Sequence, residues 1–366
     1  MLRAIASRAQ LKQRYLAGRM KLGLFQNIQW PETTAQTTQY HYCIEQTVRA
    51  DELGFDSAFF VEHHFTRHGI LSSTLALLSY IAAKTRTIRL GTAVLVLPFH
   101  DPVRLAEEAA IIDLLSGGRL DLGVGRGFQW TEFNGFDLSL DGSTDRFDES
   151  LEVILKAWRE PGQFTHHGRF WRYNEISVEP KPLQTPHPPV WVAAGSVESA
   201  TKAGRKGLRL QLASGVSFER IPALIEAYQS GLCKGGHSFS SENVLLSRVT
   251  HIETTRARAW DIALPYYEWF RRMVAQVSPA PGRASPFNSE PLTPRLEGPV
   301  GHQPGDPGLF FCTPDECCAA LEEIGAMGVG QVIFQGNWGG MPQEDVLRSL
   351  DLIGREVVPH FSAAVK

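Results

Sequence analysis

The chain has 366 residues, of which 36 are Lys or Arg and 39 are Asp or Glu, so its formal net charge is −3. Apolar residues make up 43% of the chain and charged residues 20%, which is typical of globular proteins. This balance provides no strongly basic surface for nucleic acid, and no apolar run is long enough to span a bilayer. The aromatic content of 10% excludes disorder for most of the chain.

The cysteine pattern indicates free thiols. The five cysteines are Cys43, Cys233, Cys312, Cys317 and Cys318. Their number is odd and no two are spaced as Cys-x-x-Cys, so neither a disulfide framework nor a cysteine zinc site is expected. We therefore expect buried thiols in a reducing, cytoplasmic setting, and no metal.

The first 19 residues form a segment of distinct composition. They include five basic residues and no acidic one, and Met20 directly precedes the first predicted strand. A basic N-terminal arm or an upstream start codon is favoured over a transit peptide, because the segment has only composition in common with the latter. We assign 1–19 to this arm and 20–361 to one domain.

Eight short apolar runs are predicted to be strands. In chain order they are Lys21–Phe25, Ser57–Val61, Ile88–Thr92, Leu120–Val124, Val190–Ala194, Arg209–Leu212, Val244–His251 and Val329–Gln335. Amphipathic segments between them predict helices at Gln39–Leu53, Val103–Leu115, Asp145–Trp158, Val197–Lys206, Phe218–Lys234, Thr313–Ala326 and Gln343–Val357. Regular alternation of strand and helix predicts a (β/α)₈ TIM barrel, with an open doubly wound sheet as the competing fold.

Two insertions interrupt the alternation. Residues 163–182 contain the alternating run FTHHGRFWRY and then ISVEP, which predict an added hairpin. A second insertion covers about 254–312, and its part 278–308 has eight Pro and five Gly, which predicts a long loop. Barrel enzymes often place such loops over the end of the barrel that carries the active site.

Reactive side chains in a barrel follow the carboxyl ends of the strands. The sequence Glu62-His63-His64 follows the second predicted strand, and a histidine there could act as a base or hydrogen-bond donor. A metal site is disfavoured because adjacent residues point apart, whereas structural hydrogen bonding stays an alternative. Aromatic residues predicted to line an apolar pocket beside this cluster, or to be core, are Trp30, Phe65, Phe99, Phe128 and Trp130.

Two further segments suggest a phosphate site. Arg126 lies in the glycine-rich sequence Gly-Val-Gly-Arg-Gly at 123–127, where a guanidinium and close backbone approach are both available. Gly195, Ser196 and Ser199 begin a predicted helix, whose N-terminus attracts anions. A tight turn is the alternative for the glycines.

The chain resembles the bacterial luciferase-like flavin monooxygenase family over nearly all of 20–361. The resemblance rests on MKLGLF at 20–25, ADELGFDSAFFVEHHFTRHG at 50–69, RLGTAVLVLPFHDPVRLAEE at 89–108 and DLLSGGRLDLGVGRGF at 113–128. It extends to PVWVAAGSVESATKAG at 189–204 and FQGNWGGMPQEDVLRSLDLIGREVVPHF at 334–361.

The resemblance implies a dimeric TIM barrel that reacts reduced FMN with dioxygen and oxygenates a small, largely apolar organic substrate through a peroxyflavin. A separate NAD(P)H-dependent reductase is expected to supply the reduced FMN. Two alternatives stay open: a deazaflavin-dependent dehydrogenase on the same scaffold, and a non-catalytic flavin-binding protein.

Site residues implied by the resemblance fall into two groups. His63 is similar to the family's catalytic histidine, with His64 beside it and Glu62 bracing both. Cofactor contacts are expected from Arg126 at the flavin phosphate, from Ser196 and Ser199 with Gly195, and from a non-prolyl cis peptide between Ala93 and Val94. Luciferase's α subunit has a Cys where this chain has Gly125 and a Glu where it has Gly195, and the glycine at 125 weighs against light emission.

Overall fold

Eight parallel strands form a closed barrel in the computed structural model, which describes residues 20–277, 292–294, 296–301 and 308–362. The barrel strands are β1 (Lys21–Gln26), β2 (Ser57–Phe60), β3 (Arg89–Thr92), β5 (Leu120–Gly125), β8 (Val190–Ala193), β9 (Arg209–Leu212), β10 (Val244–Ile252) and β12 (Gln331–Gln335). Each pairs with the next, and β12 returns to pair with β1, so the sheet closes. The predicted TIM barrel and all eight predicted strands are confirmed.

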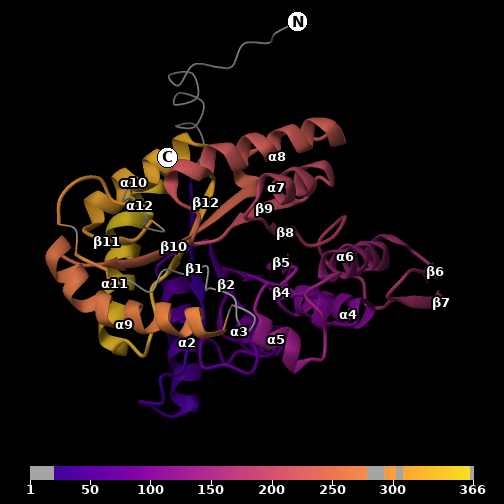
Figure 1. Cartoon of the computed structure of the whole chain (residues 1–366), viewed down its shortest axis with the longest axis horizontal. Coiled ribbons are helices and arrows are strands. Elements are labelled where there is room, and N and C mark those ends of the chain that lie inside the picture. The colour runs from indigo at the N-terminus through magenta and orange to yellow at the C-terminus, as the bar shows by residue number, and fades with distance from the viewer. Residues whose placement is uncertain (1–19, 278–291, 295, 302–307, 363–366) are drawn as a thin grey trace, which may run out of the picture.

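Helices surround the strands, as Figure 1 shows. One follows each barrel strand: α2 (Gln36–Glu52), α3 (Thr74–Lys84), α4 (Pro102–Leu115), α6 (Ser143–Arg159), α7 (Val197–Arg205), α8 (Ile221–Gly235), α10 (Pro314–Ala326) and α11 (Gln343–Leu352). Helix α10 begins as its sequence predicts, because Thr313 caps it and exchanges hydrogen bonds with Glu316. Helix α3 was not predicted; its sequence TLALLSYIAAK is apolar nearly throughout and has no polar face to reveal the helical period.

Shorter elements decorate the barrel at the ends of its strands. They are β4 (Leu95–Val96), the 3₁₀ turns η1 (Leu97–Phe99), η2 (Phe218–Arg220) and η3 (Ser241–Asn243), α5 (Trp130–Gly135), β11 (Phe310–Cys312), the π-turn η4 (Ile353–Val357) and α12 (Val358–Phe361). Strand β4 pairs with β5 just beyond β3, so the chain leaving β3 stays at the barrel rim before α4 begins. None of the described helices is long and apolar enough to cross a lipid bilayer.

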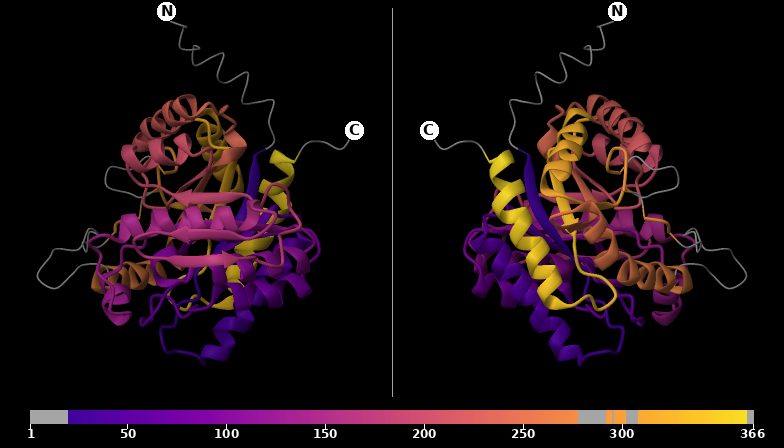
Figure 2. Two further views of the ribbon diagram at one scale, coloured as in Figure 1. Left: turned by 90° about the vertical axis from the view of Figure 1, so that its right-hand side faces the viewer. Right: turned by 90° about the vertical axis from the view of Figure 1, so that its left-hand side faces the viewer.

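Both predicted insertions have structured parts. Residues 163–182 contain the antiparallel hairpin β6 (Phe164–His167) and β7 (Arg172–Ile176), which projects from the barrel beside α6 (Figures 1 and 2). The segment 254–312 begins with a 22-residue helix, α9 (Arg256–Val277), where the sequence analysis expected only an insertion. Most of the Pro/Gly-rich part 278–308 lies outside the described residues, as does the expected arm 1–19.

The barrel interior pairs large side chains with glycines. Phe59, Trp191, Leu245 and Ile333 pack together with Ala93 inside the ring of strands. A Cβ added to Gly91 would lie 2.3 Å from the Phe59 ring, so the glycine makes room for that phenylalanine. Toward the carboxyl ends of the strands, Ala93, Ala193 and Gly125 have small side chains or none.

Candidate active site

His63 follows β2 and contacts a carboxylate from another loop. Its Nδ1 lies 2.8 Å from Oε1 of Glu132 in α5, and both side chains are buried. The same oxygen accepts a hydrogen bond from the backbone N–H of His64, at 3.1 Å. With Nδ1–H donating to Glu132, Nε2 of His63 is the nitrogen able to accept a proton.

A second imidazole packs against His63. The ring of His68 lies 4.4 Å from that of His63, centroid to centroid, and stacks at 5.3 Å on Phe270 of α9. Burial and the neighbouring His63 hold the pKa of His68 well below its usual range, so His68 is neutral. The Gln129 amide nitrogen lies 3.2 Å from Nδ1 of His63 and 3.4 Å from Nδ1 of His68.

Glu62 supports His64 and His100, and does not contact His63 directly. Its Oε1 accepts from Nε2 of His64 at 2.7 Å and from Nε2 of His100 at 2.8 Å, and its Oε2 accepts from the backbone N–H of Val96 at 2.8 Å. Burial opposes ionisation of this carboxyl, but the hydrogen bonds from His100, His64 and Val96 outweigh it and lower the pKa of Glu62 to about 2. Glu62 is therefore a buried, hydrogen-bonded carboxylate.

The peptide bond between Ala93 and Val94 is cis, as the resemblance implies. The Ala93 N–H donates to the carbonyl of Phe60 at 2.8 Å, and the Val94 carbonyl accepts from the Glu62 N–H at 3.4 Å, so this segment is tied to the end of β2. On the other side, Val94 packs on Gly125: a Cβ there would lie 2.5 Å from Cγ2 of Val94. Gly125 thus lets the Ala93–Val94 segment approach β5 closely.

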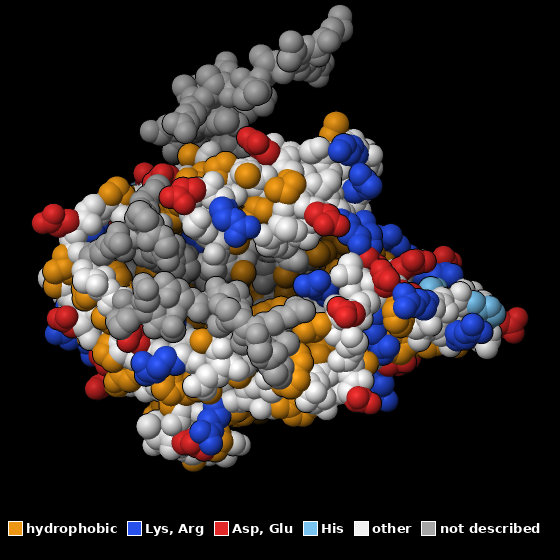
Figure 3. All heavy atoms as spheres, viewed as in Figure 1, with side chains coloured by type: hydrophobic (Ala, Val, Ile, Leu, Met, Phe, Trp, Pro, Cys, Tyr) orange, Lys and Arg blue, Asp and Glu red, His pale blue; other side chains and the backbone are white. Residues whose placement is uncertain are grey.

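The residues expected at a flavin phosphate follow adjacent strands. Arg126 follows β5, Gly195 and Ser196 follow β8, and these two strands pair in parallel. Arg126 is exposed, with Nη1 3.4 Å from Oγ1 of Thr144. Figure 3 shows a hollow near the middle of the molecular face, in the region where Figure 1 labels β5 and β8.

Ser196 and Ser199 form the cap of helix α7. Each hydroxyl accepts from the other residue's backbone N–H, at 3.1 and 3.2 Å. Arg220 of η2 adds a cation, because its Nη2 donates to the Gly195 carbonyl at 2.7 Å. A Cβ on Gly195 would meet no atom within 4 Å, so there is open space before this helix. A helix N-terminus with two nearby hydroxyls and a guanidinium suits an anion.

The predicted pocket aromatics divide into two sets. Phe65 and Phe99 lie 5.7 and 5.8 Å from the His64 ring, and Phe133 and Phe136 complete that cluster. Phe65 and Phe128 are 59% and 51% exposed, so they lie at an entrance and not in a closed wall. The remaining two have no ring contact with this cluster among the described residues. Trp130 begins α5, and Trp30 donates to the Thr34 carbonyl and packs near Arg67.

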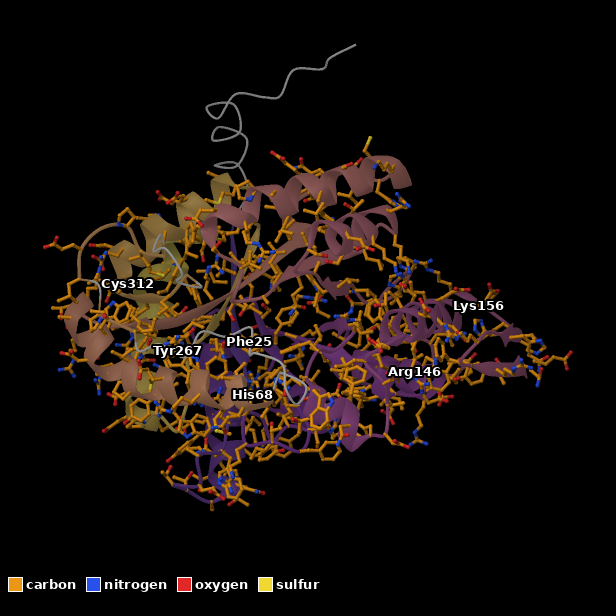
Figure 4. All side chains as sticks on the ribbon, in the orientation of Figure 1. Phe25, His68, Arg146, Lys156, Tyr267 and Cys312 are labelled. Atoms are coloured by element: carbon orange, nitrogen blue, oxygen red, sulfur yellow. The ribbon has the colours of Figure 1, made fainter. Side chains whose placement is uncertain are left out.

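The barrel mouth suits a planar heterocycle with hydrogen-bonding edges. Asn27 Oδ1, Gln211 Oε1 and Ser247 Oγ are buried there and find no hydrogen-bond partner among the described residues. Buried polar atoms are nearly always satisfied, so atoms left in this state indicate a site for a ligand or water. Together with the small side chains at this end, they are compatible with the ring of a flavin. Figure 4 places Phe25 and His68 near the middle of the molecule, and Arg146 toward the hairpin.

The sequence analysis assigned no role to Glu132, His68, His100 or Gln129. The first two flank His63, and His100 completes the donors around Glu62. Glu132 and Gln129 belong to α5 and its N-cap, and Glu132 is 69 positions from His63, so no local spacing signals that contact. The one available signal was a polar residue within an otherwise aromatic segment, at Glu132 in WTEF and at His100 after PF.

Comparison with known proteins agrees with this barrel and identifies its family. The family model described as luciferase-like monooxygenase matches residues 20–329. The oxygenase component of flavin-dependent trigonelline monooxygenase from Acinetobacter baylyi is 28% identical over 365 residues, covering 94% of this chain and 96% of that protein.

Solved structures show the same fold. Monooxygenase RslO1 from Streptomyces bottropensis superposes with a TM-score of 0.82 at 28% identity, covering 94% of this chain and all of that one. The oxygenating constituent of 3,6-diketocamphane monooxygenase from Pseudomonas putida, solved with FMN, has a TM-score of 0.72 at 20% identity, covering 93% and 98%. An F420-dependent secondary alcohol dehydrogenase shares the fold too, with a TM-score of 0.73, 15% identity and coverage of 94% and 100%. The chain belongs to the luciferase-like monooxygenase family and is a flavin-dependent monooxygenase.

Proposed function

We propose that this protein is the oxygenase of a two-component system that uses reduced FMN and dioxygen to oxygenate a small, largely apolar organic substrate. The observation that carries the proposal is His63, held by Glu132 beside a barrel mouth whose buried polar atoms have no partner among the described residues. Support also comes from a relative named as an oxygenase component and from a structural neighbour solved with FMN. A separate NAD(P)H-dependent reductase is the proposed source of reduced FMN.

His63 is the proposed proton-transfer residue. Bound reduced FMN supplies the electrons that reduce one atom of dioxygen while the other enters the substrate. Glu132 accepts the Nδ1 hydrogen of His63, which fixes the ring orientation and leaves Nε2 to take or give a proton. His64 is held by Glu62 through its ring and by Glu132 through its backbone N–H, so it links the two carboxylates.

The cofactor would lie across the barrel mouth. Ala93 and Val94 form the proposed rest for the ring, and Gly125 leaves the space that they occupy. At the other end, Arg126 and the α7 N-terminus, with Gly195, Ser196 and Ser199, are the proposed phosphate contacts. These positions follow β3, β5 and β8, three consecutive strands of the barrel.

The aromatic cluster beside His64 favours an apolar substrate. Phe65, Phe99 and Phe136 surround the His64 ring, and exposed Phe65 and Phe128 form an apolar approach to it. Trp130, at the start of α5, is the proposed continuation of this surface, and Trp30 is assigned to its outer edge.

A homodimer is the proposed assembly. The exposed apolar side chains Ile111, Leu114 and Leu115 of α4 and Tyr80 of α3 are 43–66% exposed, and α3 packs on α4. Apolar side chains gathered on adjacent helices are typical of a protein–protein interface. Sedimentation of the wild type against a Leu115→Glu variant tests it, with a halved mass expected for the variant.

The deciding experiment is an anaerobic binding titration followed by oxygen exposure. Reduced FMN is expected to quench tryptophan fluorescence at low concentration, and reduced F420 is not. With ¹⁸O₂ and a panel of aldehydes, ketones and heteroaromatic compounds, one labelled oxygen atom is expected in a product. Preference for F420 with hydride transfer and no oxygen uptake would show a dehydrogenase, and FMN binding that yields peroxide with every substrate would favour a non-catalytic flavin carrier.

A further inference from the structure

The segment from Ala93 to His100 is held by backbone hydrogen bonds and by hydrogen bonds to the Glu62 side chain. Backbone hydrogen bonds tie Ala93 and Val94 to the end of β2. Two residues after Val94, the contact with this strand end is made by a side chain: the Val96 N–H donates to Oε2 of Glu62. The chain between the cis peptide and η1 is therefore held from two sides, by the pairing of β4 with β5 and by the Glu62 carboxylate.

His100 is a further hydrogen-bond partner of the Glu62 carboxylate. It follows η1, and its Nε2 approaches both oxygens of Glu62, at 2.8 and 3.0 Å. The Glu62 side chain is fully buried, so its charge depends on protein donors alone. Of the three donor groups, His64 and Val96 each approach one oxygen, whereas His100 approaches both.

We propose that Glu62 and His100 are positioning residues that hold the Ala93–Val96 segment in the conformation on which a flavin ring rests. The pair sets the affinity for flavin and not the rate of the chemical step. This inference rests on the proposed FMN site. The sequence suggested that Glu62 braces His63 and His64, and the inference adds His100 to its partners. His100 contacts neither His63 nor Glu132 in any recorded hydrogen bond or ring contact of the described residues.

The charges around His100 make the pair pH-dependent. Facing groups are Glu62 and His64 beyond β2, Glu108 of α4, and Asp101, whose Oδ2 accepts from the Tyr173 hydroxyl of β7. Burial lowers the pKa of His100, but the hydrogen bond and charge of Glu62 and the charge of Glu108 raise it on balance. The charged hydrogen bond is thus present at low pH and lost as pH rises through this raised pKa. Flavin binding is expected to weaken over the same range.

Two substitutions of His100 test the proposal, with a matched control. His100→Ala removes the donor, whereas His100→Gln keeps an N–H donor but cannot titrate. The control is His360→Ala, because His360 also bonds to a glutamate, Glu322 at 2.9 Å, but is exposed on α12. Measurements are the dissociation constant of FMN from pH 6 to 9, kcat at saturating reduced FMN, and hydrogen exchange of residues 93–100 in the cofactor-free protein.

His100→Ala is expected to weaken FMN binding about tenfold, equivalent to about 1.4 kcal/mol, and to speed exchange in 93–100. Its kcat at saturating flavin should fall far less than its affinity. His100→Gln is a neutral donor at every pH, so it should bind FMN about as tightly as the wild type does above the pKa of His100 and show no decline with pH. His360→Ala should match the wild type in every measurement.

Several results would overturn the inference. FMN affinity of His100→Ala within twofold of the wild type is one, and a large loss of kcat with unchanged affinity is another. If His100→Ala does not fold, the pH profile of His100→Gln decides alone, and a profile equal to that of the wild type contradicts the proposal. If the wild type binds no FMN, the proposed function fails, and unchanged exchange in the variants then refutes the positioning role separately.

Discussion

Buried polar side chains at the two ends of the barrel interior differ in whether they have hydrogen-bond partners. At the amino ends of the strands, Asp121 accepts from Nε of Arg89 at 2.6 Å and from Nε1 of Trp191 at 3.2 Å. Nearby, Gln331 donates to the Ser57 hydroxyl at 2.7 Å. At the carboxyl ends, buried polar atoms of Asn27, Gln211 and Ser247 have no partner within the described parts of the chain.

This difference separates stability from ligand binding within one core. Buried polar groups that are fully paired contribute to folding, whereas unpaired ones cost folding free energy and persist where a ligand uses them. The paired polar groups and the proposed cofactor site thus lie at opposite ends of the same strands, as is general for TIM barrels. Substitutions at the two ends should therefore separate activity from stability.

The largest effect is expected at the carboxyl end, from His63→Ala. Removing a proton-transfer residue typically lowers the rate by about 10²- to 10⁴-fold. Oxygenation of a coupled substrate per folded molecule should fall by that factor. Because His63 is buried and is a hydrogen-bond partner of Glu132, the free energy of unfolding should also fall, by about 1–3 kcal/mol. His167→Ala, which alters an exposed histidine in the hairpin, is the control and should keep full activity. Full coupled oxygenation by His63→Ala would remove His63 from the mechanism.

The second-largest effect is a loss of stability, expected from a substitution at the amino end. Asp121→Ala leaves Nε1 of Trp191 and Nε of Arg89 without their acceptor and should lower the free energy of unfolding by about 2–3 kcal/mol. Activity per folded molecule should stay unchanged. Asp148→Ala, which breaks surface ion pairs to Lys202 and Lys206, should cost less than about 1 kcal/mol. An equal cost in both variants would mean that the amino end carries no special stability.

Much of this architecture can be predicted from the sequence, because strands appear as short apolar runs and amphipathic helices as a regular spacing of apolar residues. Helix α9 was missed since Pro265 lies inside it and polar residues obscure its apolar face. The triplet from Glu62 to His64 was found because three titratable residues follow a strand. The contacts of this triplet with Glu132 and His100 were not predicted, because they form only where separate loops meet at the barrel rim.

The smallest effect offers the sharpest comparison, between two serines inside the same barrel. Ser57 Oγ accepts from Gln331, whereas Ser247 Oγ is buried and unpaired among the described residues. Ser57→Ala should lower the free energy of unfolding by about 1 kcal/mol and leave FMN affinity unchanged. Ser247→Ala should leave stability unchanged or raise it by up to about 1 kcal/mol, because an unsatisfied hydroxyl is removed.

FMN affinity of the Ser247→Ala protein should instead fall severalfold, measured by fluorescence titration beside the unfolding curves. The two serines then show opposite signatures, one in stability and one in binding. If Ser247→Ala lowers stability but leaves FMN affinity unchanged, its hydroxyl stabilises the fold as that of Ser57 does. The division between the two ends of the barrel then fails at this position. A loss of affinity without loss of stability places the ligand against β10, on the side of the mouth opposite the Ala93–Val94 peptide.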